Sequence, residues 1–282
     1  MRGFAAGMAL AVAPWPMLCA LSGAVSNDPL LIALITWGFA LLLRMANGRW
    51  TFGGAALFAL VAGLGILTKT TAIVLLPVAG LAWILTPATN RRNSALAVAL
   101  ILPLLIAGPW LIRNLQLYGD PFALRVFNEA FVGSAQKSQI QGDGGAFAYW
   151  IHWVGWWTIR SIIGVFGYMD IWLNERGTPF SEGPNALYRV LFLAGNLAAL
   201  AAAGLWRRPG LPEEARRFAR IGFGFAGCVL VLFLLFNNRY FQAQGRYMLP
   251  AIAPLAATFV AGLGALLRGR WALAGAIVGA VL

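Results

Sequence analysis

Four polar clusters interrupt this apolar sequence, and their side chains are of the kinds that bind phosphate and carry protons. The clusters are Ser26-Asn27-Asp28, Lys69, Arg113 with Tyr118-Gly119-Asp120-Pro121, and Gln244-Gly245-Arg246-Tyr247. They fall at alternate ends of successive apolar stretches, so they meet on one face if those stretches cross a bilayer. Cations and carboxylates gathered on one side of a membrane predict an active site for an anionic, lipid-linked substrate.

Two of the clusters also have structural interpretations. Asn27-Asp28 followed by Pro29 is a pattern that caps a helix and places Pro at its first position. Lys69 lies between two short apolar runs, where it either snorkels to the headgroups or binds a phosphate or carboxylate. Capping and function are compatible at Asp28, and both interpretations of Lys69 stay open.

Arginine and tryptophan supply further candidates. A planar guanidinium can grip two phosphate oxygens at once, which makes Arg a better phosphate clamp than Lys. The arginines in suitable places are Arg113, Arg160, Arg239 and Arg246. Trp150, Trp153 and Trp157 have helical spacing, with Arg160 one turn later, which predicts an amphipathic helix in the membrane interface. An aromatic belt explains these Trp residues equally well, although Trp faces also stack on sugars.

Metal and nucleotide chemistry find little support in the sequence. The one His, His152, and two Cys in apolar segments, Cys19 and Cys228, lack the spacing of a metal site or a disulfide framework. Neither a Walker loop nor a dinucleotide fingerprint occurs, which disfavours an ATP-driven pump.

Composition identifies the class of protein that must position these residues. Of 282 residues, 60% are hydrophobic and only 11% charged, and the mean hydropathy of +0.76 is outside the soluble range. The net charge of +12 arises from Arg residues dispersed among short loops, which indicates membrane topology and not nucleic-acid binding. We therefore predict an integral membrane protein.

The apolar runs predict an all-α, polytopic bundle of about eight to nine transmembrane helices. The runs are 3–24, 29–44, 52–68, 71–87, 94–112, 186–205, 220–237 and 248–267, with a partial ninth from 272 to the end. They do not alternate as the strands of a β-barrel do. Residues 1–112 thus hold five spans, 113–185 form a long loop with short or interfacial helices, and 186–282 hold the remaining spans.

Loop charges set the predicted orientation. If the spans alternate, Arg44, Arg49, Arg91 and Arg92 share one side with the arginines of 207–220 and 268–270. That side is cytoplasmic by the positive-inside rule. The opposite side receives the polar clusters and the loop 113–185. We expect a multi-pass protein of the cytoplasmic (inner) membrane.

Five motifs, in order along nearly the whole chain, resemble landmarks of the domain-of-unknown-function 2142 membrane family. They are Ser26-Asn27-Asp28, Gly65-Ile66-Leu67-Thr68-Lys69-Thr70, Trp110-Leu111-Ile112-Arg113-Asn114 with Tyr118-Gly119-Asp120-Pro121, Gly164-Val165-Phe166-Gly167-Tyr168, and Gln244-Gly245-Arg246-Tyr247-Met248-Leu249-Pro250. That family is similar to the GT-C glycosyltransferases, such as protein mannosyltransferases and the aminoarabinose transferases of lipid A. The resemblance implies transfer of a sugar from a polyprenyl-phosphate donor to a cell-envelope glycan, lipid or protein on the extracytoplasmic face.

Such transfer needs a carboxylate that takes the acceptor proton and cations that stabilise the leaving phosphate. Asp28 and Asp120 are the candidate carboxylates, and Trp156 or Trp157 would shape the sugar or lipid groove. The candidate substrate-binding residues are Asn27, Lys69, Arg113, Tyr118, Arg160, Trp156, Trp157, Arg239, Gln244 and Arg246. No protein metal site is expected, and the resemblance leaves a divalent cation open, because some GT-C enzymes use one.

One departure from the GT-C pattern concerns the catalytic acid. Those enzymes typically carry it in the first extracytoplasmic loop, often in an Asp-Glu or Asp-Asp motif that this sequence lacks. The chain opens in what resembles a middle span and stops within an apolar run, so we expect a portion of a longer protein or a shortened paralogue. Asp28 is the residue that could substitute.

Two other classes of function stay open. A secondary transporter also gathers charge along a membrane pathway, and Asp28 with Lys69 would form its substrate or proton site. A non-catalytic subunit for envelope assembly needs no catalytic acid at all.

Overall fold

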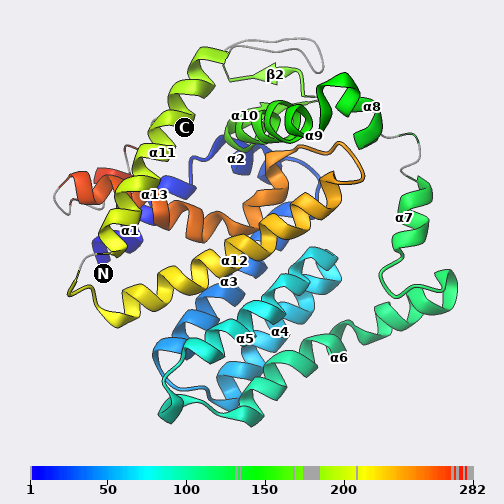
Figure 1. Ribbon diagram of the computed structural model, residues 1–282. Coiled ribbons are helices and arrows are strands. Elements are labelled where there is room, and N and C mark those ends of the chain that lie inside the picture. Colours follow the sequence, from blue (N-terminus) through cyan, green and yellow to red (C-terminus); the bar gives the residue numbers. More distant parts are fainter. Residues whose placement is uncertain are drawn as a thin grey trace. The chain divides into compact units, whose positions relative to one another are not determined.

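In the computed structural model, the described residues are 2–130, 133, 135–167, 169–173, 185–207, 209–267, 270, 273–275 and 277. The described chain is nearly all-α, as predicted, with one antiparallel hairpin of β1 (Val165–Phe166) and β2 (Ile171–Trp172) (Figure 1). Tyr168, Arg208, Arg268 and most of the predicted ninth span lie outside the described residues.

Packing divides the chain into two compact units. The first comprises Met1–Ser26, Lys137–Pro212 and Leu235–Leu282, and the second Asn27–Gln136 and Glu213–Leu234. This division follows packing and not sequence order, so the proposed segments 1–112, 113–185 and 186–282 stay a prediction.

Among the described residues, five helical segments are long and apolar enough to cross a membrane. They are α3 (Asp28–Asn47), α6 (Asn93–Tyr118), most of α11 (Asn185–Trp206), α12 (Glu213–Asn237), and η5 (Gly245–Ala251) continued by α13 (Ile252–Leu266). Their length and composition support an integral membrane protein. The number of spans and the GT-C type stay predictions.

Three of the predicted spans are shorter or broken as helices. Residues 3–24 form α1 (Arg2–Val12) and α2 (Pro16–Gly23), which meet at 62°. Pro14 and Pro16 explain the break, because proline lacks an N–H and restricts the residue before it. The predicted span 52–68 forms α4 (Phe52–Thr68), and the predicted span 71–87 forms η1 (Thr70–Val74) with α5 (Leu75–Leu85).

The unit that contains α3 to α6 packs through small residues. A Cβ at Gly63 of α4 would lie 2.7 Å from the Ile106 side chain of α6, so the two helices are in close contact. Phe39 of α3 packs on Phe225 of α12, with ring centroids 5.1 Å apart. Two further elements, η2 (Ala88–Asn90) and α7 (Leu124–Ala130), belong to the same unit.

Arg217 fixes the end of α3 in this unit. Its Nη1 donates to the Ala46 carbonyl at 3.0 Å and to Asn47 Oδ1 at 2.9 Å. A cation at a helix C-terminus satisfies carbonyls that have no partner within the helix and complements the helix dipole. The arginine that the sequence marks as a topology signal therefore also stabilises α3.

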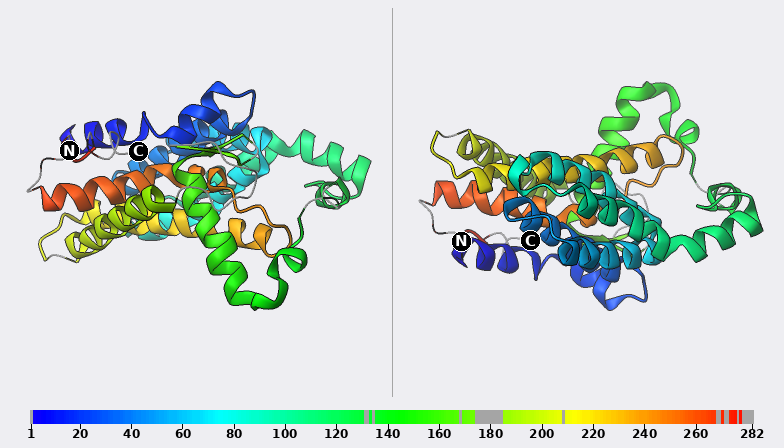
Figure 2. Two further views of the ribbon diagram at one scale, coloured as in Figure 1. Left: turned by 90° about the horizontal axis from the view of Figure 1, so that it is seen from above. Right: turned by 90° about the horizontal axis from the view of Figure 1, so that it is seen from below.

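In the other unit, α11 and α13 lie side by side (Figure 2). A Cβ at Gly262 would overlap the backbone of Ala198, so glycine is needed where the helices cross. The predicted loop contributes a succession of short helices to this unit. They are α8 (Lys137–Gln141), η3 (Gly142–Gly144), α9 (Gly145–Ala148), the π-helix η4 (Tyr149–Gly155) and α10 (Trp156–Gly164).

Candidate functional site

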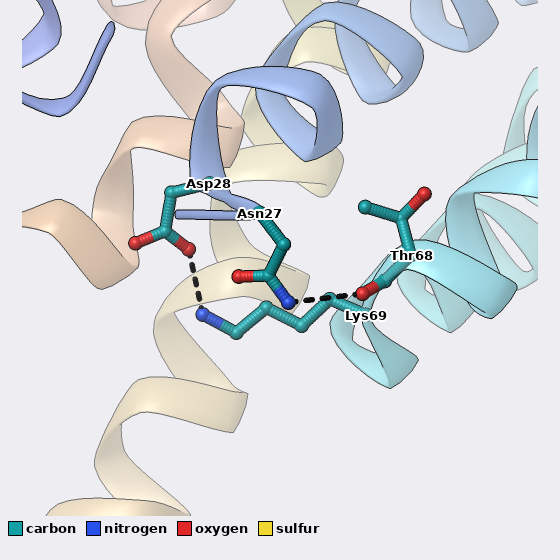
Figure 3. A network of polar contacts seen from close by, with 4 residues as sticks. All are labelled: Asn27, Asp28, Thr68 and Lys69. Carbon is teal, nitrogen blue, oxygen red and sulfur yellow. Dashed lines mark hydrogen bonds and ion pairs between the residues drawn. The ribbon is translucent and has the colours of Figure 1, made fainter. Parts of the chain in front are cut away.

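An ion pair joins two helix ends at the first cluster. Asp28 is the first residue of α3, and Lys69 directly follows the last residue of α4. Lys69 Nζ donates to Asp28 Oδ1 at 2.7 Å, and 28% of the Lys69 side chain and 9% of the Asp28 side chain are exposed (Figure 3). Each charge also complements the dipole of its own helix. The carboxylate is thus the more buried partner. Its negative charge balances the Lys69 ammonium in the absence of a substrate.

Asn27 reinforces this junction in an unexpected way. It occupies the N-cap position of α3, but among the described residues its side chain makes no capping bond to that helix. Its amide nitrogen instead donates to the Thr68 carbonyl at 3.0 Å, at the end of α4 (Figure 3). The sequence pattern thus correctly marks the N-cap position and the early Pro of α3, but the Asn27 side chain bonds to α4 instead of capping α3.

The Asp120 carboxylate is bound to the backbone. The α6 helix ends at Tyr118 and is followed by Gly119, which has the left-handed φ of 69° that favours glycine. Asp120 Oδ1 accepts the Phe122 N–H at 2.9 Å, and Oδ2 accepts the Leu124 N–H at 2.7 Å. The Phe122 bond, followed by the Leu124 bond, lowers the pKa of Asp120 from its ordinary value. These bonds start α7 and make the carboxylate a weaker base.

The other residues predicted near Asp120 lie at the same end of α6. Arg113 is exposed, and its guanidinium lies 5.1 Å from the Trp110 ring centroid. Tyr118 is the last residue of α6 and is half-buried. Buried Asn114 donates to the Pro121 carbonyl at 3.2 Å and holds the following turn against the helix. Arg113 is thus accessible to an anion.

The Trp-rich helix builds an aromatic cage around Arg160. Its guanidinium lies 5.3, 4.3 and 5.1 Å from the ring centroids of Trp156, Trp157 and Trp172. The hairpin β1–β2 supplies Trp172, and Arg160 is only 3% exposed. Cation–π contacts of this kind stabilise the cation in place. Arg160 and the two predicted Trp residues are therefore together, but the guanidinium is covered.

The π-helix changes the predicted spacing of the aromatic face. A π-helix closes its hydrogen bonds five residues apart, so positions after it are rotated relative to an α-helix. Trp157 is buried, whereas Trp150, Trp153 and Trp156 are half-buried. The helical conformation is confirmed, and its place in the membrane interface stays a prediction.

Ser161 and Gly245 connect α10 to the cluster that contains Arg246. Ser161 Oγ is fully buried and accepts the Gly245 N–H at 2.6 Å. A Cβ at Gly245 would overlap the Ile162 backbone, so only glycine permits this approach. Sequence analysis did not identify Ser161. The only sign of the contact in the sequence is the glycine beside Arg246.

Arg246 presents a partly buried guanidinium beside Tyr247. Its side chain is half-buried, and its Nε is buried without a hydrogen bond to any described residue. Its guanidinium lies 5.3 Å from the Tyr247 ring centroid. A buried, unsatisfied N–H requires an explanation, and a bound anion is one. Neighbouring Gln244 donates to Gln242 Oε1 at 3.2 Å.

Arg239 differs from Arg246 in its surroundings. It is exposed, and its guanidinium lies 5.3 Å from the ring centroid of Tyr240. Its backbone carbonyl accepts the Lys137 N–H at 3.1 Å, which ties this loop to α8. Arg239 is therefore a surface cation whose backbone carbonyl joins the loop to α8.

The structure thus assembles the candidates in three places. Asn27, Asp28 and Lys69 meet at one junction, and Arg113, Tyr118 and Asp120 share the end of α6; both places lie in one unit. The other unit holds the Trp cage with the Arg246 cluster, which Ser161 connects. Within the described residues, no group of three or more His, Cys, Asp or Glu side chains could hold a metal ion.

No family model, curated protein or solved structure matches the chain.

Proposed function

We propose that the protein is a multi-pass enzyme of the cytoplasmic membrane, similar to GT-C glycosyltransferases. It would transfer a sugar from a polyprenyl-phosphate donor to a cell-envelope acceptor on the extracytoplasmic face. The observation that supports this proposal is the ion pair between Asp28 and Lys69 at the junction of two apolar helices. Charged side chains in such segments are costly, and they commonly mark a substrate or proton site.

In the proposed reaction, Lys69 binds the donor phosphate and Asp28 acts as the general base. The donor phosphate would compete with Asp28 for the Lys69 ammonium, because both are anions that accept the same charge-assisted hydrogen bond. Binding of the phosphate would release the Asp28 carboxylate, which then acts as the general base. The base becomes available only when the donor is bound.

The transfer step follows from these roles. The acceptor hydroxyl oxygen forms a bond to the anomeric carbon while the bond from that carbon to the phosphate oxygen breaks. The hydroxyl proton passes to Asp28, and the electron pair leaves with the polyprenyl phosphate. Lys69 stabilises the charge that develops on this phosphate. Asp120 is the weaker candidate for the base, since two backbone N–H groups already bind its carboxylate.

A secondary transporter is the second candidate, and the same ion pair favours it. A carboxylate and an ammonium that exchange partners within apolar helices also serve proton-coupled transport. In that case Asp28 would take a proton as an anionic solute displaces it from Lys69. No sugar bond would break.

Reconstitution of the full chain in proteoliposomes distinguishes the two candidates. Release of polyprenyl phosphate from a panel of polyprenyl-phosphate sugars is the readout for transfer, and counterflow of a soluble anion is the readout for transport. We expect turnover that falls about 10²- to 10⁴-fold in Asp28→Asn, the usual contribution of a general base. Lys69→Met should weaken binding of polyprenyl phosphate.

Glu129→Gln is the matched control. Glu129 also pairs with a cation, Arg125, at 3.8 Å, but the carboxylate side chain is 68% exposed and remote from the junction in sequence. This variant should keep full turnover. Full turnover by Asp28→Asn, or counterflow without release of polyprenyl phosphate, would exclude the proposed reaction.

A further inference from the structure

A cavity of about 430 Å³ lies among α10, α11, α13 and the turn that precedes α2, all within one unit. Its walls include Ile159, Ile162, Gly195, Ala199, Leu255 and Phe259. The volume is within the range of roughly 300 to 1,000 Å³ that is typical of small-molecule sites. It contains none of the residues to which a role in transfer is assigned above.

The chemistry of the walls selects a hydrocarbon ligand. Trp15 and Asn196 are the two described lining residues whose side chains carry hydrogen-bonding groups. Trp15 Nε1 donates to the Ile162 carbonyl at 2.6 Å, and the Asn196 amide nitrogen donates to the Phe192 carbonyl at 2.7 Å. Both side chains thus bond to the protein's own backbone, and the remaining wall is apolar.

Small residues of α11 create the space. Ala194, Gly195, Ala198 and Ala199 have the spacing of one helical face and line the cavity. The backbones of α11 and α13 touch at Ala198 and Gly262, which holds the two helices at a fixed separation. A Cβ added at Gly195 would lie 3.3 Å from the Phe259 ring, so glycine permits the close approach of the two helices here. Small side chains therefore line part of the α11 wall, whereas larger apolar side chains line the α13 wall.

The surroundings indicate which hydrocarbon enters. Both α11 and the segment of η5 and α13 are long and apolar enough to cross a membrane, where hydrocarbon chains would surround them. Exposed Arg189 precedes the lining residue Phe192 by three positions, which places both on one side of α11. Helical side chains tilt toward the helix N-terminus, and a guanidinium near the end of a span can extend to lipid phosphates.

We propose that this cavity binds one acyl chain of an anionic glycerophospholipid whose phosphate pairs with Arg189. The chain fills the space between α10 and the pair of α11 and α13. The lipid is a bound component that stabilises this arrangement by mass action. This role is independent of sugar transfer and holds whether or not the protein is an enzyme.

Photocrosslinking tests the site in the full-length protein in nanodiscs. The probe is phosphatidylglycerol with a diazirine on one acyl chain, and peptide mass spectrometry locates the adducts. We expect adducts to concentrate on Leu255, Phe259 and Leu263. Gly195→Leu should lower that yield about tenfold, as expected if about two buried methylene groups are displaced.

Matched variants separate occupancy from damage to the fold. Gly204→Leu places the same side chain on the same helix, where a Cβ meets nothing within 4 Å, and should keep the wild-type yield. If Gly195→Leu does not fold, Ala199→Leu replaces it. Arg189→Gln should reduce the preference for phosphatidylglycerol over phosphatidylcholine, whereas Arg207→Gln, at the other end of α11, should not.

Three outcomes would overturn the proposal. Adducts spread evenly over Leu193, Leu197 and Leu200 would show only the lipid that surrounds any membrane protein. An unchanged yield in Gly195→Leu would show that the cavity is not the site. Displacement of the probe by polyprenyl phosphate at lower concentrations than by phosphatidylglycerol would assign the cavity to an isoprenoid chain.

Discussion

Lys69 donates a 2.7 Å hydrogen bond to Asp28 across the junction between the end of α4 and the start of α3. Residues 41 positions apart in the sequence thus neutralise each other between apolar helices. The pair both fixes the two helix ends and keeps a carboxylate and an ammonium ready for exchange with an anion. Structural and functional roles are therefore combined at one contact.

Removal of one partner should cost more stability than removal of both. Lys69→Met leaves Asp28 as a buried charge without its ammonium, and we expect a loss of about 1 to 3 kcal/mol. Asp28→Asn with Lys69→Met should lose less than the sum of the single variants. The coupling free energy between Asp28 and Lys69 follows from unfolding in detergent micelles of the wild type, the two single variants and the double variant. Additive losses would contradict an ion pair that stabilises the junction.

The Asn27 side chain offers a second test, because Asn and Asp are equally good helix caps. A capping role predicts that Asn27→Asp is neutral. In the structure the amide nitrogen donates to the Thr68 carbonyl, and a carboxylate would present an acceptor there instead. We expect Asn27→Asp to lower stability by about 1 to 3 kcal/mol, with Asn27→Ser as the comparison. Equal thermal unfolding of wild type and Asn27→Asp would restore the capping interpretation.

Asp120 tests whether a backbone-bound carboxylate can also be catalytic. Ser at this position retains an oxygen that accepts a backbone N–H, so Asp120→Ser should preserve most of the start of α7. If Asp28 is the base, Asp120→Ser should keep turnover within about tenfold of wild type, well short of the 10²- to 10⁴-fold loss for a base. Rates of polyprenyl phosphate release at several pH values are the measurement. A loss as large as that in Asp28→Asn would make Asp120 the base.

The elements were more predictable than the contacts between them. Long apolar runs require helices in a bilayer, because only helices satisfy their own backbone, and α3, α6, α11 and α12 follow those runs. The cluster at Asp28 and the distant Lys69 were both visible in the sequence as polar interruptions. Their pairing was not, because it depends on how α3 packs against α4.

Local irregularities were the other limit on prediction. Pro14 and Pro16 are visible breakers, but the apolarity of residues 3–24 concealed the 62° bend that follows from them. The π-helix at Tyr149–Gly155 has no signature in residue spacing, so the aromatic face of the Trp-rich segment was predicted with an α-helical period. Burial of Arg160 in the Trp cage also depends on Trp172 from the hairpin.

Burial raises the pKa of Tyr149 to about 12, which predicts that the stability of the folded protein falls at alkaline pH. The folded protein keeps the phenol proton more tightly than the unfolded chain, whose pKa is about 10. The contribution to stability is therefore complete below pH 10 and is lost as the pH rises toward 12. Alkaline titration of phenolate absorbance should show a transition near pH 12 that Tyr149→Phe removes. A transition that persists in the variant would assign it to another Tyr.

Gly245 offers the sharpest test of the connection between α10 and the Arg246 cluster. A Cβ would overlap the backbone of Ile162, and neither segment can relax without loss of the Ser161 bond to the Gly245 N–H. We expect Gly245→Ala to destabilise the protein by about 1 to 3 kcal/mol.

The control Gly204→Ala, in an open helical position, should stabilise it by up to about 1 kcal/mol. Ser161→Ala should reproduce part of the Gly245→Ala loss, since it leaves the same N–H without an acceptor. The measurement is thermal unfolding of the three variants. Equal midpoints for Gly245→Ala and Gly204→Ala would mean that α10 and the segment at Gly245 do not meet as described.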